Sequence, residues 1–352
     1  CVRCDRFDGF PCLTDGKADS HVVCVRPALK HPNVTLLTHA RVERLDADAS
    51  GRSVRRVVVD RGGREETYSA DIVVVSGGAV NSAALLLRSV SDKHPGGLAN
   101  SSGVVGRHYM AHLNSAVIAI SRAPNETRFQ KTLGLNDYYW GAADSDLPLG
   151  HIQMLGKSDR NILRTAAPRF APRRALDYLA RHSLDFWLTT EDLPDPRNRV
   201  TLDRHGSIHL AKTEHNTEPH KRLLAKLEHL LVPLGCHAKG IRRWSVLSQH
   251  VPIAGIAHNC GTVRFGTDPR QSALDADCKA HDLDNLYVVD TSFFPSSSAV
   301  NPGLTAMANA LRVGDHLLER LGTRSAAGRR HKRTSHAQVG QRAESSIQGG
   351  AG

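Results

Sequence analysis

The sequence predicts a mixed α/β (α+β) fold, in which a discontinuous α/β domain carries an inserted domain with a mostly antiparallel sheet. Three observations predict it: strand and helix patterns mix up to about residue 110, strand-like alternation dominates residues 111–250, and an α/β pattern then returns. The 352 residues are 40% hydrophobic and 23% charged, as in a globular protein that buries sizeable cores.

The first segment predicts strands followed by a helix. Runs rich in β-forming residues predict strands at residues 34–45, 54–60 and 66–76. Gly62 and Gly63 lie between the last two runs and predict a hairpin turn, because glycine adopts the positive φ angles that tight turns need. A helix is expected over residues 79–89.

The middle segment predicts an antiparallel sheet with one helix. Its strand-like stretches alternate apolar and polar residues, and they cover residues 116–121, 151–155, 185–190 and 198–202. Leucines at helical spacing predict a helix over residues 219–232. No stretch of the sequence approaches the roughly 20 uninterrupted apolar residues of a membrane helix, so no membrane span is expected.

The last segment returns to an α/β pattern. Residues 286–290 (LYVVD) predict a buried strand, and residues 304–321 predict a long helix that follows Asn301, Pro302 and Gly303. We expect this strand and this helix to complete the α/β domain that the first segment begins.

The net charge of +11 is concentrated at the end of the chain. Residues 323–352 hold six basic residues and one acidic residue, about half of the excess. This stretch has almost no large apolar side chains, so we expect a disordered, solvated tail. It also has no aromatic residue that could stack on a base, so no nucleic-acid partner is expected.

Cysteines gather at the start of the chain, at Cys1, Cys4, Cys12 and Cys24. Zinc sites prefer two closely spaced pairs, and this spacing offers one, so no metal is expected. Reduced thiols or a local disulfide are the expected state, and their role stays open.

Three motifs in the last third of the chain carry chemistry. His258 begins the sequence HNCGT, Asp290 ends the predicted strand and precedes Thr291, and Asn301 precedes the long helix. Histidine suits the removal of a hydroxyl proton at neutral pH, because its ordinary pKa is about 6.5. The sequence contains neither a G-x-G-x-x-G dinucleotide motif nor a G-x-S-x-G nucleophile elbow.

These motifs, in this order, resemble the C-terminal signature of the glucose–methanol–choline (GMC) oxidoreductase family. The family pattern is His-x-x-Gly-Thr/Cys, a strand ending in Asp, and Asn-Pro-x-x-Thr at the start of a long helix. Residues 76–82 (SGGAVNS) and 97–107 (GLANSSGVVGR) are similar to further family segments. The resemblance covers residues 1–321 and lacks the family's N-terminal Gly-rich FAD motif.

The resemblance implies a flavoprotein with FAD as cofactor. It predicts an FAD-binding domain at residues 1–110 and 251–321, a substrate domain at 111–250 and a tail at 322–352. The implied activity is oxidation of a CH–OH group of a small-molecule alcohol or sugar, by proton abstraction and hydride transfer to flavin N5. Substrate identity and the electron acceptor, whether oxygen, a quinone or a redox partner, stay open.

The resemblance also implies roles for individual residues. His258 is the base or orients the alkoxide, and Asn301 places the substrate oxygen. The expected FAD contacts are Val42, Ser76, Gly77, Gly78, Asp290, Thr291, Asn301, Pro302 and Gly303. The helix that opens at Pro302 is expected to direct its positive end at the flavin pyrimidine edge.

Two departures from the family pattern limit these expectations. The missing Gly-rich segment predicts that this chain alone binds FAD poorly and is inactive. His108 stands where the family often has Asn.

The alternative to an oxidoreductase is a non-catalytic fragment or pseudoenzyme that interacts through its basic tail. No secretory or transit segment is visible, but an incomplete N-terminus would hide one, so the location stays open and cytoplasmic is only the default expectation.

Overall fold

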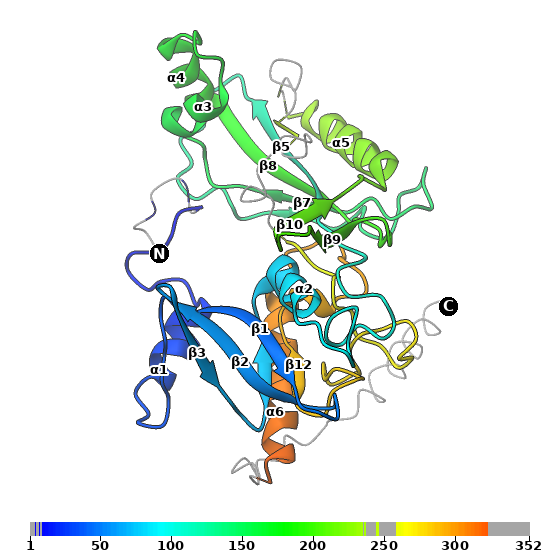
Figure 1. Ribbon diagram of the computed structural model, residues 1–352. Coiled ribbons are helices and arrows are strands. Elements are labelled where there is room, and N and C mark those ends of the chain that lie inside the picture. The colour runs from blue at the N-terminus through cyan, green and yellow to red at the C-terminus, as the bar shows by residue number, and fades with distance from the viewer. Residues whose placement is uncertain are drawn as a thin grey trace, which may run out of the picture.

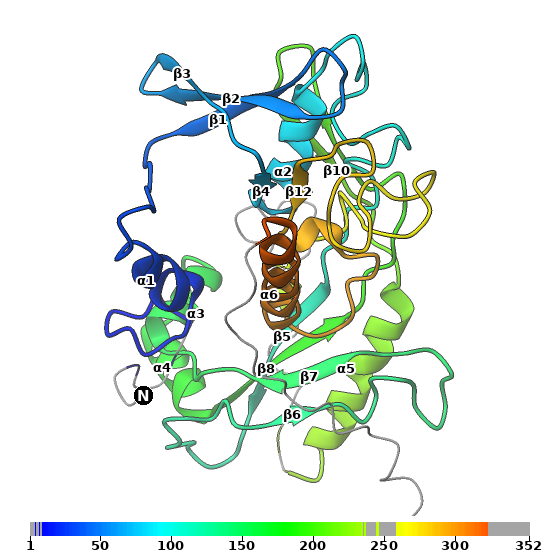
Figure 2. The same ribbon diagram turned by 90° about the horizontal axis from the view of Figure 1, so that it is seen from below.

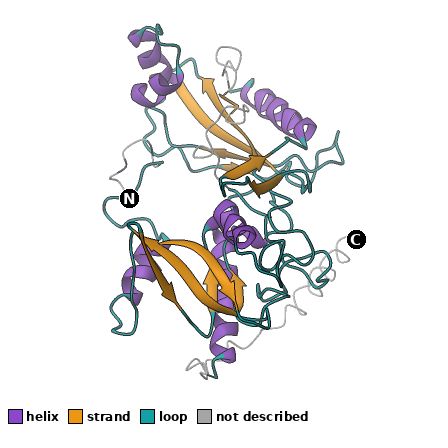
Figure 3. Cartoon of the chain, viewed as in Figure 1, coloured by secondary structure: helices purple, strands orange, loops and turns teal. Residues whose placement is uncertain are grey.

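The computed structural model describes residues 4, 7, 9–234, 236, 244–245 and 258–322. Cys1 and the expected tail beyond Gly322 lie outside these residues. The described chain forms two parts, one above the other in Figure 1, and each has its own hydrophobic core. Figure 3 shows strands and helices mixed in both parts, so the predicted fold class is confirmed.

The first part begins with a short helical segment and a three-stranded antiparallel sheet. Its elements are η2 (His21–Val25), α1 (Arg26–Ala28), β1 (Arg41–Ala47), β2 (Val54–Arg61) and β3 (Arg64–Tyr68). Gly62 and Gly63 make the turn between β2 and β3 with φ angles of 65° and 87°, which confirms the predicted hairpin. The predicted strand at residues 66–76 is divided, because residues 69–72 leave the sheet before the next strand begins.

That next strand, β4 (Val73–Val75), pairs in parallel with β12 (Leu286–Val288). The helix α2 (Gly78–Arg88) follows β4, and the short helix η4 (Thr291–Phe293) follows β12. The long helix α6 (Gly303–Arg320) lies beside this strand pair, as Figure 2 shows. It contacts β12 through Tyr287, whose hydroxyl lies 3.1 Å from His316 Nε2 and accepts a hydrogen bond of 2.8 Å from Arg320.

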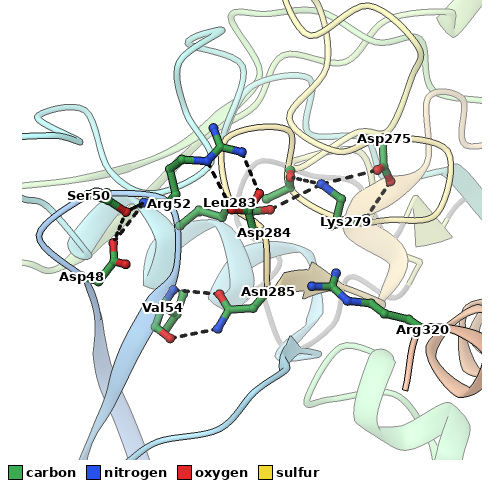
Figure 4. A network of polar contacts seen from close by, with 12 residues as sticks. Asp48, Ser50, Arg52, Val54, Asp275, Lys279, Leu283, Asp284, Asn285 and Arg320 are labelled. Atoms are coloured by element: carbon green, nitrogen blue, oxygen red, sulfur yellow. Dashed lines mark hydrogen bonds and ion pairs between the residues drawn. The ribbon is translucent and has the colours of Figure 1, made fainter. Parts of the chain in front are cut away.

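A polar network joins the three-stranded sheet to the chain before β12 (Figure 4). The Arg52 guanidinium donates to both carboxylate oxygens of Asp284, at 2.7 and 3.2 Å. The Asn285 amide bonds the backbone of Val54 in both directions: its Oδ1 accepts from the N–H at 2.8 Å, and its Nδ2 donates to the carbonyl at 3.0 Å. Segments more than 200 residues apart therefore form one folded unit.

The second part is built on a five-stranded antiparallel sheet in the order β11-β5-β8-β7-β6. Its strands are β5 (Leu113–Ile120), β6 (Gly134–Leu135), β7 (His151–Met154), β8 (Ser183–Thr190) and β11 (Trp244–Ser245). The helix α5 (Thr217–Leu231) packs on it through Leu223, Leu227 and Leu231, which are buried. The helix and the predicted strands at residues 116–121, 151–155 and 185–190 are confirmed, whereas the predicted strand at residues 198–202 forms β9 outside this sheet.

Two helices of this part were not predicted, α3 (Arg160–Ala166) and α4 (Arg173–His182). In α4 the only buried residues are Leu176 and His182, although its sequence, RRALDYLARH, is strongly amphipathic and does carry a helical period. A separate two-stranded ladder, β9 (Arg199–Leu202) and β10 (Ile208–Ala211), adjoins α2 of the first part. Within the described ranges, no helix has the length and apolar content needed to cross a membrane.

Candidate active site

Asp290 joins the two segments that leave the carboxyl ends of β4 and β12. Its Oδ2 accepts a 2.8 Å hydrogen bond from the Gly78 N–H, and its Oδ1 accepts one of 2.8 Å from the Ser292 N–H. The hydroxyls of Ser82 and Ser292 donate to the same carboxylate. The structure thus brings Gly78, Asp290 and Thr291 together where α/β folds bind their ligands, beyond the carboxyl ends of parallel strands.

The surface around this point is open next to the backbone. Gly78 has a φ of 83°, and apart from its chain neighbours and its own helix backbone no atom lies within 4 Å of the place where a side chain would begin. The position of a side chain at Gly303 is likewise open. Ser76 and Gly77 are exposed. A bound group could therefore contact the backbone directly, and a side chain at Gly78 would occupy that space.

Asn301 is exposed and does not cap the helix that follows it. The N-cap of α6 is Pro302, which makes no side-chain capping bond. Because α6 is 18 residues long, its uncapped first turn presents N–H groups and a partial positive charge. This end of the helix suits an electron-rich group.

His258 pairs with His112, a residue that the sequence did not predict. Their Nδ1 atoms lie 3.0 Å apart, and His112 Nε2 lies 2.9 Å from the carbonyl oxygen of Ser297. A carbonyl only accepts hydrogen bonds, so Nε2 of His112 carries the proton and the Nδ1 of neutral His112 accepts. His258 must then donate from Nδ1, which leaves its Nε2 without a proton and able to accept one.

Burial keeps both imidazoles neutral. It lowers the pKa of His112 to about 4, and it also lowers the pKa of His258. His112 is fully buried, whereas His258 is partly exposed and has a left-handed backbone with a φ of 67°. A neutral, partly accessible imidazole is the form needed to remove a hydroxyl proton.

The loop that carries His258 is tied to the Asp290 segment. Thr291 Oγ1 donates to the Asn259 carbonyl at 2.6 Å, and the Gly261 N–H bonds the Thr291 carbonyl at 3.3 Å. Gly261 has a φ of 92°, and a side chain there would begin 2.4 Å from the His108 carbonyl oxygen. These contacts connect the two predicted groups of residues, the histidine and the strand-end acid.

A buried ion pair supports His112 from the neighbouring residue. Asp192 Oδ2 accepts from the Ala111 N–H at 3.1 Å and lies 3.2 Å from Lys212 Nζ, which donates to the Ala111 carbonyl at 2.9 Å. Burial raises the pKa of Asp192. The backbone N–H of Asp192 donates to the Ser297 hydroxyl at 3.1 Å. Asp192 therefore also positions Ser297, whose carbonyl accepts from His112 Nε2. No sequence motif singled out Asp192, Lys212 or Ser297.

The remaining predicted residues lie apart from this network. Val42 lies on β1 opposite Val59 and is 37% exposed. Among the described residues, no hydrogen bond links Val42, Asn301 or Gly303 to His258 or Asp290. His108 has a φ of 61°, and burial lowers its pKa to about 4.

The cysteines in the described part of the first segment are free thiols at Cys4, Cys12 and Cys24. Hydrogen bonds from Thr14 are the largest cause that lowers the pKa of Cys12, to about 7.

The chain belongs to the GMC oxidoreductase family: an N-terminal model of that family matches residues 4–114, and a C-terminal model matches residues 194–310.

The chain is similar in sequence to two curated relatives and similar in fold to a solved structure. It is 31% identical to 6'''-hydroxyparomomycin C oxidase of Streptomyces lividus, over 93% of this chain and 59% of the relative. It is 32% identical to paromamine 6'-oxidase of Streptomyces fradiae, over 89% and 57%. A formate oxidase of Aspergillus oryzae has a TM-score of 0.61 at 14% identity, covering 85% of this chain and 62% of that one. The chain thus spans less than two thirds of the length of these proteins.

Proposed function

We propose that this chain is the part of an FAD-dependent oxidoreductase that carries the catalytic histidine, and that the whole enzyme oxidises a CH–OH group. The pairing of His258 with His112 carries the proposal. It leaves an unprotonated Nε2 on a partly exposed, neutral imidazole, which is the property that a base for alcohol oxidation requires.

In this proposal His258 Nε2 accepts the hydroxyl proton of the substrate. The resulting imidazolium keeps its Nδ1–H directed at His112, whose own proton stays on Nε2 and is donated to the Ser297 carbonyl. Asn301, exposed at the start of α6, would hold the substrate oxygen through its amide. FAD, when bound, supplies the acceptor for the hydride.

The surface beside Asp290 is the proposed binding site for the FAD. Asp290 and Thr291 would lie next to its ribityl and diphosphate, with Ser76, Gly77 and Gly78 at the turn beside it. Pro302 and Gly303 would present the helix N-terminus to the flavin ring, and Val42 would meet the adenine through its backbone. The open space at Gly78 and Gly303 supports this arrangement, because a bulky cofactor can approach the backbone there.

The proposed substrate is a small hydroxylated molecule of the alcohol or sugar class. The names of the relatives refer to oxidation of paromamine and of a hydroxyparomomycin, which are the basis for a sugar-like substrate. A substrate screen on an enzyme that includes the family's Gly-rich segment, with oxygen, a quinone and a dye tested in parallel, tests this class. Absence of flavin reduction by every alcohol and sugar in the screen would contradict it.

The FAD proposal has its own test in the 352-residue chain. Because the sequence contains no G-x-G-x-x-G, the diphosphate lacks its usual binding turn, and we expect weak FAD binding. Fluorescence titration with FAD, on this chain and on one extended by the Gly-rich segment, should show tight binding only in the extended protein. Stoichiometric yellow flavin on the purified short chain would contradict the expectation.

A further inference from the structure

A pocket of about 390 Å³ lies between the loop after α2 and strand β9, and none of its lining residues is assigned to the active site. Its lining includes Leu87, Asn100, Val105, Arg107, Arg199 and Leu202. The volume is within the range of small-molecule sites, about 300–1,000 Å³. The lining contains two arginines and no acidic residue, so the pocket is positively charged.

Arg107 and Arg199 are directly opposite each other in an antiparallel bridge. Side chains at opposed positions point to the same face of a ladder, and like charges placed there repel each other. Both arginines are exposed, and no residue of the described chain forms a hydrogen bond or ion pair with either guanidinium. A bound anion would remove the repulsion between them.

The backbone that carries these arginines is held firmly. The Val200 N–H bonds the Gly106 carbonyl at 2.7 Å, and the Gly106 N–H bonds the Thr262 carbonyl at 2.7 Å. Gly106 has a φ of 84°, and a side chain there would begin 2.5 Å from the Val200 carbonyl oxygen, so only glycine allows this approach. On the other wall, Asn100 Oδ1 accepts from the Val105 N–H at 3.0 Å. The pocket therefore exists before any ligand binds.

We propose that this pocket binds a small organic phosphate monoester. Two guanidinium groups match the two negative charges and the several oxygens of such a phosphate, and each can form two parallel hydrogen bonds with it. Leu87, Val105 and Leu202 line the rest of the pocket and would contact an apolar organic group. The proposed oxidation uses none of these residues, so the site is independent of it.

Calorimetric titration of the complete 352-residue chain with phenyl phosphate, at constant ionic strength, tests the proposal. Saturable binding is expected, weaker for inorganic phosphate, which lacks the apolar group, and weaker for benzoate, which carries one charge. Sodium chloride at matched ionic strength should give no saturable signal. The proposal is overturned if phenyl phosphate does not saturate, or if benzoate or inorganic phosphate binds as tightly.

Variants locate the site. Arg107→Gln and Arg199→Gln should each weaken phenyl phosphate binding about tenfold or more, because each removes charge-assisted hydrogen bonds. Arg55→Gln, at an exposed arginine on β2, removes the same net charge and should leave binding unchanged. Unaltered thermal midpoints show that the variants fold. Equal loss in all three variants, or no loss in the first two, would overturn the site.

Discussion

His112 and His258 face each other through their Nδ1 atoms, 3.0 Å apart. The Ser297 carbonyl at the far side of His112 determines which of the two donates, because it can only accept. The buried residue thus sets the tautomer of the partly exposed one. The Nε2 of His258 is unprotonated because His112 Nε2 donates to the Ser297 carbonyl, which leaves His112 Nδ1 to accept the proton of His258 Nδ1 in a hydrogen bond.

Replacing His112 tests this dependence. In His112→Phe the acceptor for His258 Nδ1–H is lost, and we expect flavin reduction by substrate to slow by about 10- to 100-fold, as for other residues that orient a reacting group. His112→Gln keeps an acceptor oxygen and should restore part of the rate. The matched control is His220→Phe, which removes another partly buried histidine, one that bonds Ser115 and Thr190. A similar rate loss in both Phe variants would contradict a specific role of His112.

The pH dependence of flavin reduction follows from the burial of His258. Burial lowers its pKa, so the neutral form persists to a lower pH than for a free histidine, whose pKa is about 6.5. We expect the rate constant to be level near neutral pH and to fall as pH decreases through an inflection below about 6.5. Rapid-mixing spectroscopy between pH 4 and 8 would show this. An inflection above pH 7, or none that depends on His258, would contradict the assignment.

Buried neutral histidines should also make folding stability depend on pH. Burial lowers the folded-state pKa of His220 to about 4, whereas the unfolded value is about 6.5. Between these values the unfolded chain binds more protons, so stability is fully present above pH 6.5 and is lost as pH falls toward 4. From pH 7.5 to 5, His220→Gln should lose about 1–2 kcal/mol less unfolding free energy than wild type, measured with urea. Equal losses would contradict burial in the neutral form.

The buried pair of Lys212 and Asp192 should contribute strongly to stability. In Lys212→Met the Asp192 carboxylate loses its counter-charge while its side chain stays inaccessible, and we expect a loss of about 3–5 kcal/mol in unfolding free energy. The control is Lys226→Met, which breaks an exposed ion pair with Asp144 and should cost less than about 1 kcal/mol. Denaturant titrations of both variants measure the difference, and equal costs would contradict the role of the buried pair.

Much of the fold could be predicted because its elements carry local patterns. The Gly62–Gly63 turn, the leucines of α5 and the apolar run of β12 each show their structure within a few residues. The amphipathic pattern of α4 is local too, so this helix could also have been predicted from its sequence. The division of the predicted strand at residues 66–76 depends on the parallel pairing of β4 with β12, more than 200 residues away, which no local pattern contains.

The same distinction applies to the candidate site. His258, Asp290 and Asn301 belong to short motifs, so the sequence singled them out. His112 lies 146 residues from His258, and Asp192 lies 81 residues from Ala111, so their contacts arise only in the folded chain. A single sequence with 20 histidines gives no reason to choose His112. The residues that set the state of the base were therefore found only in the structure.

The central claim is that His258 removes the proton that starts oxidation, and the His258→Ala variant of the FAD-loaded enzyme tests it most directly. Rapid mixing with a substrate found in the screen should show bound flavin with an unchanged spectrum, and flavin reduction slowed by about 10²- to 10⁴-fold. Flavin reduction at the wild-type rate in this variant would contradict the claim.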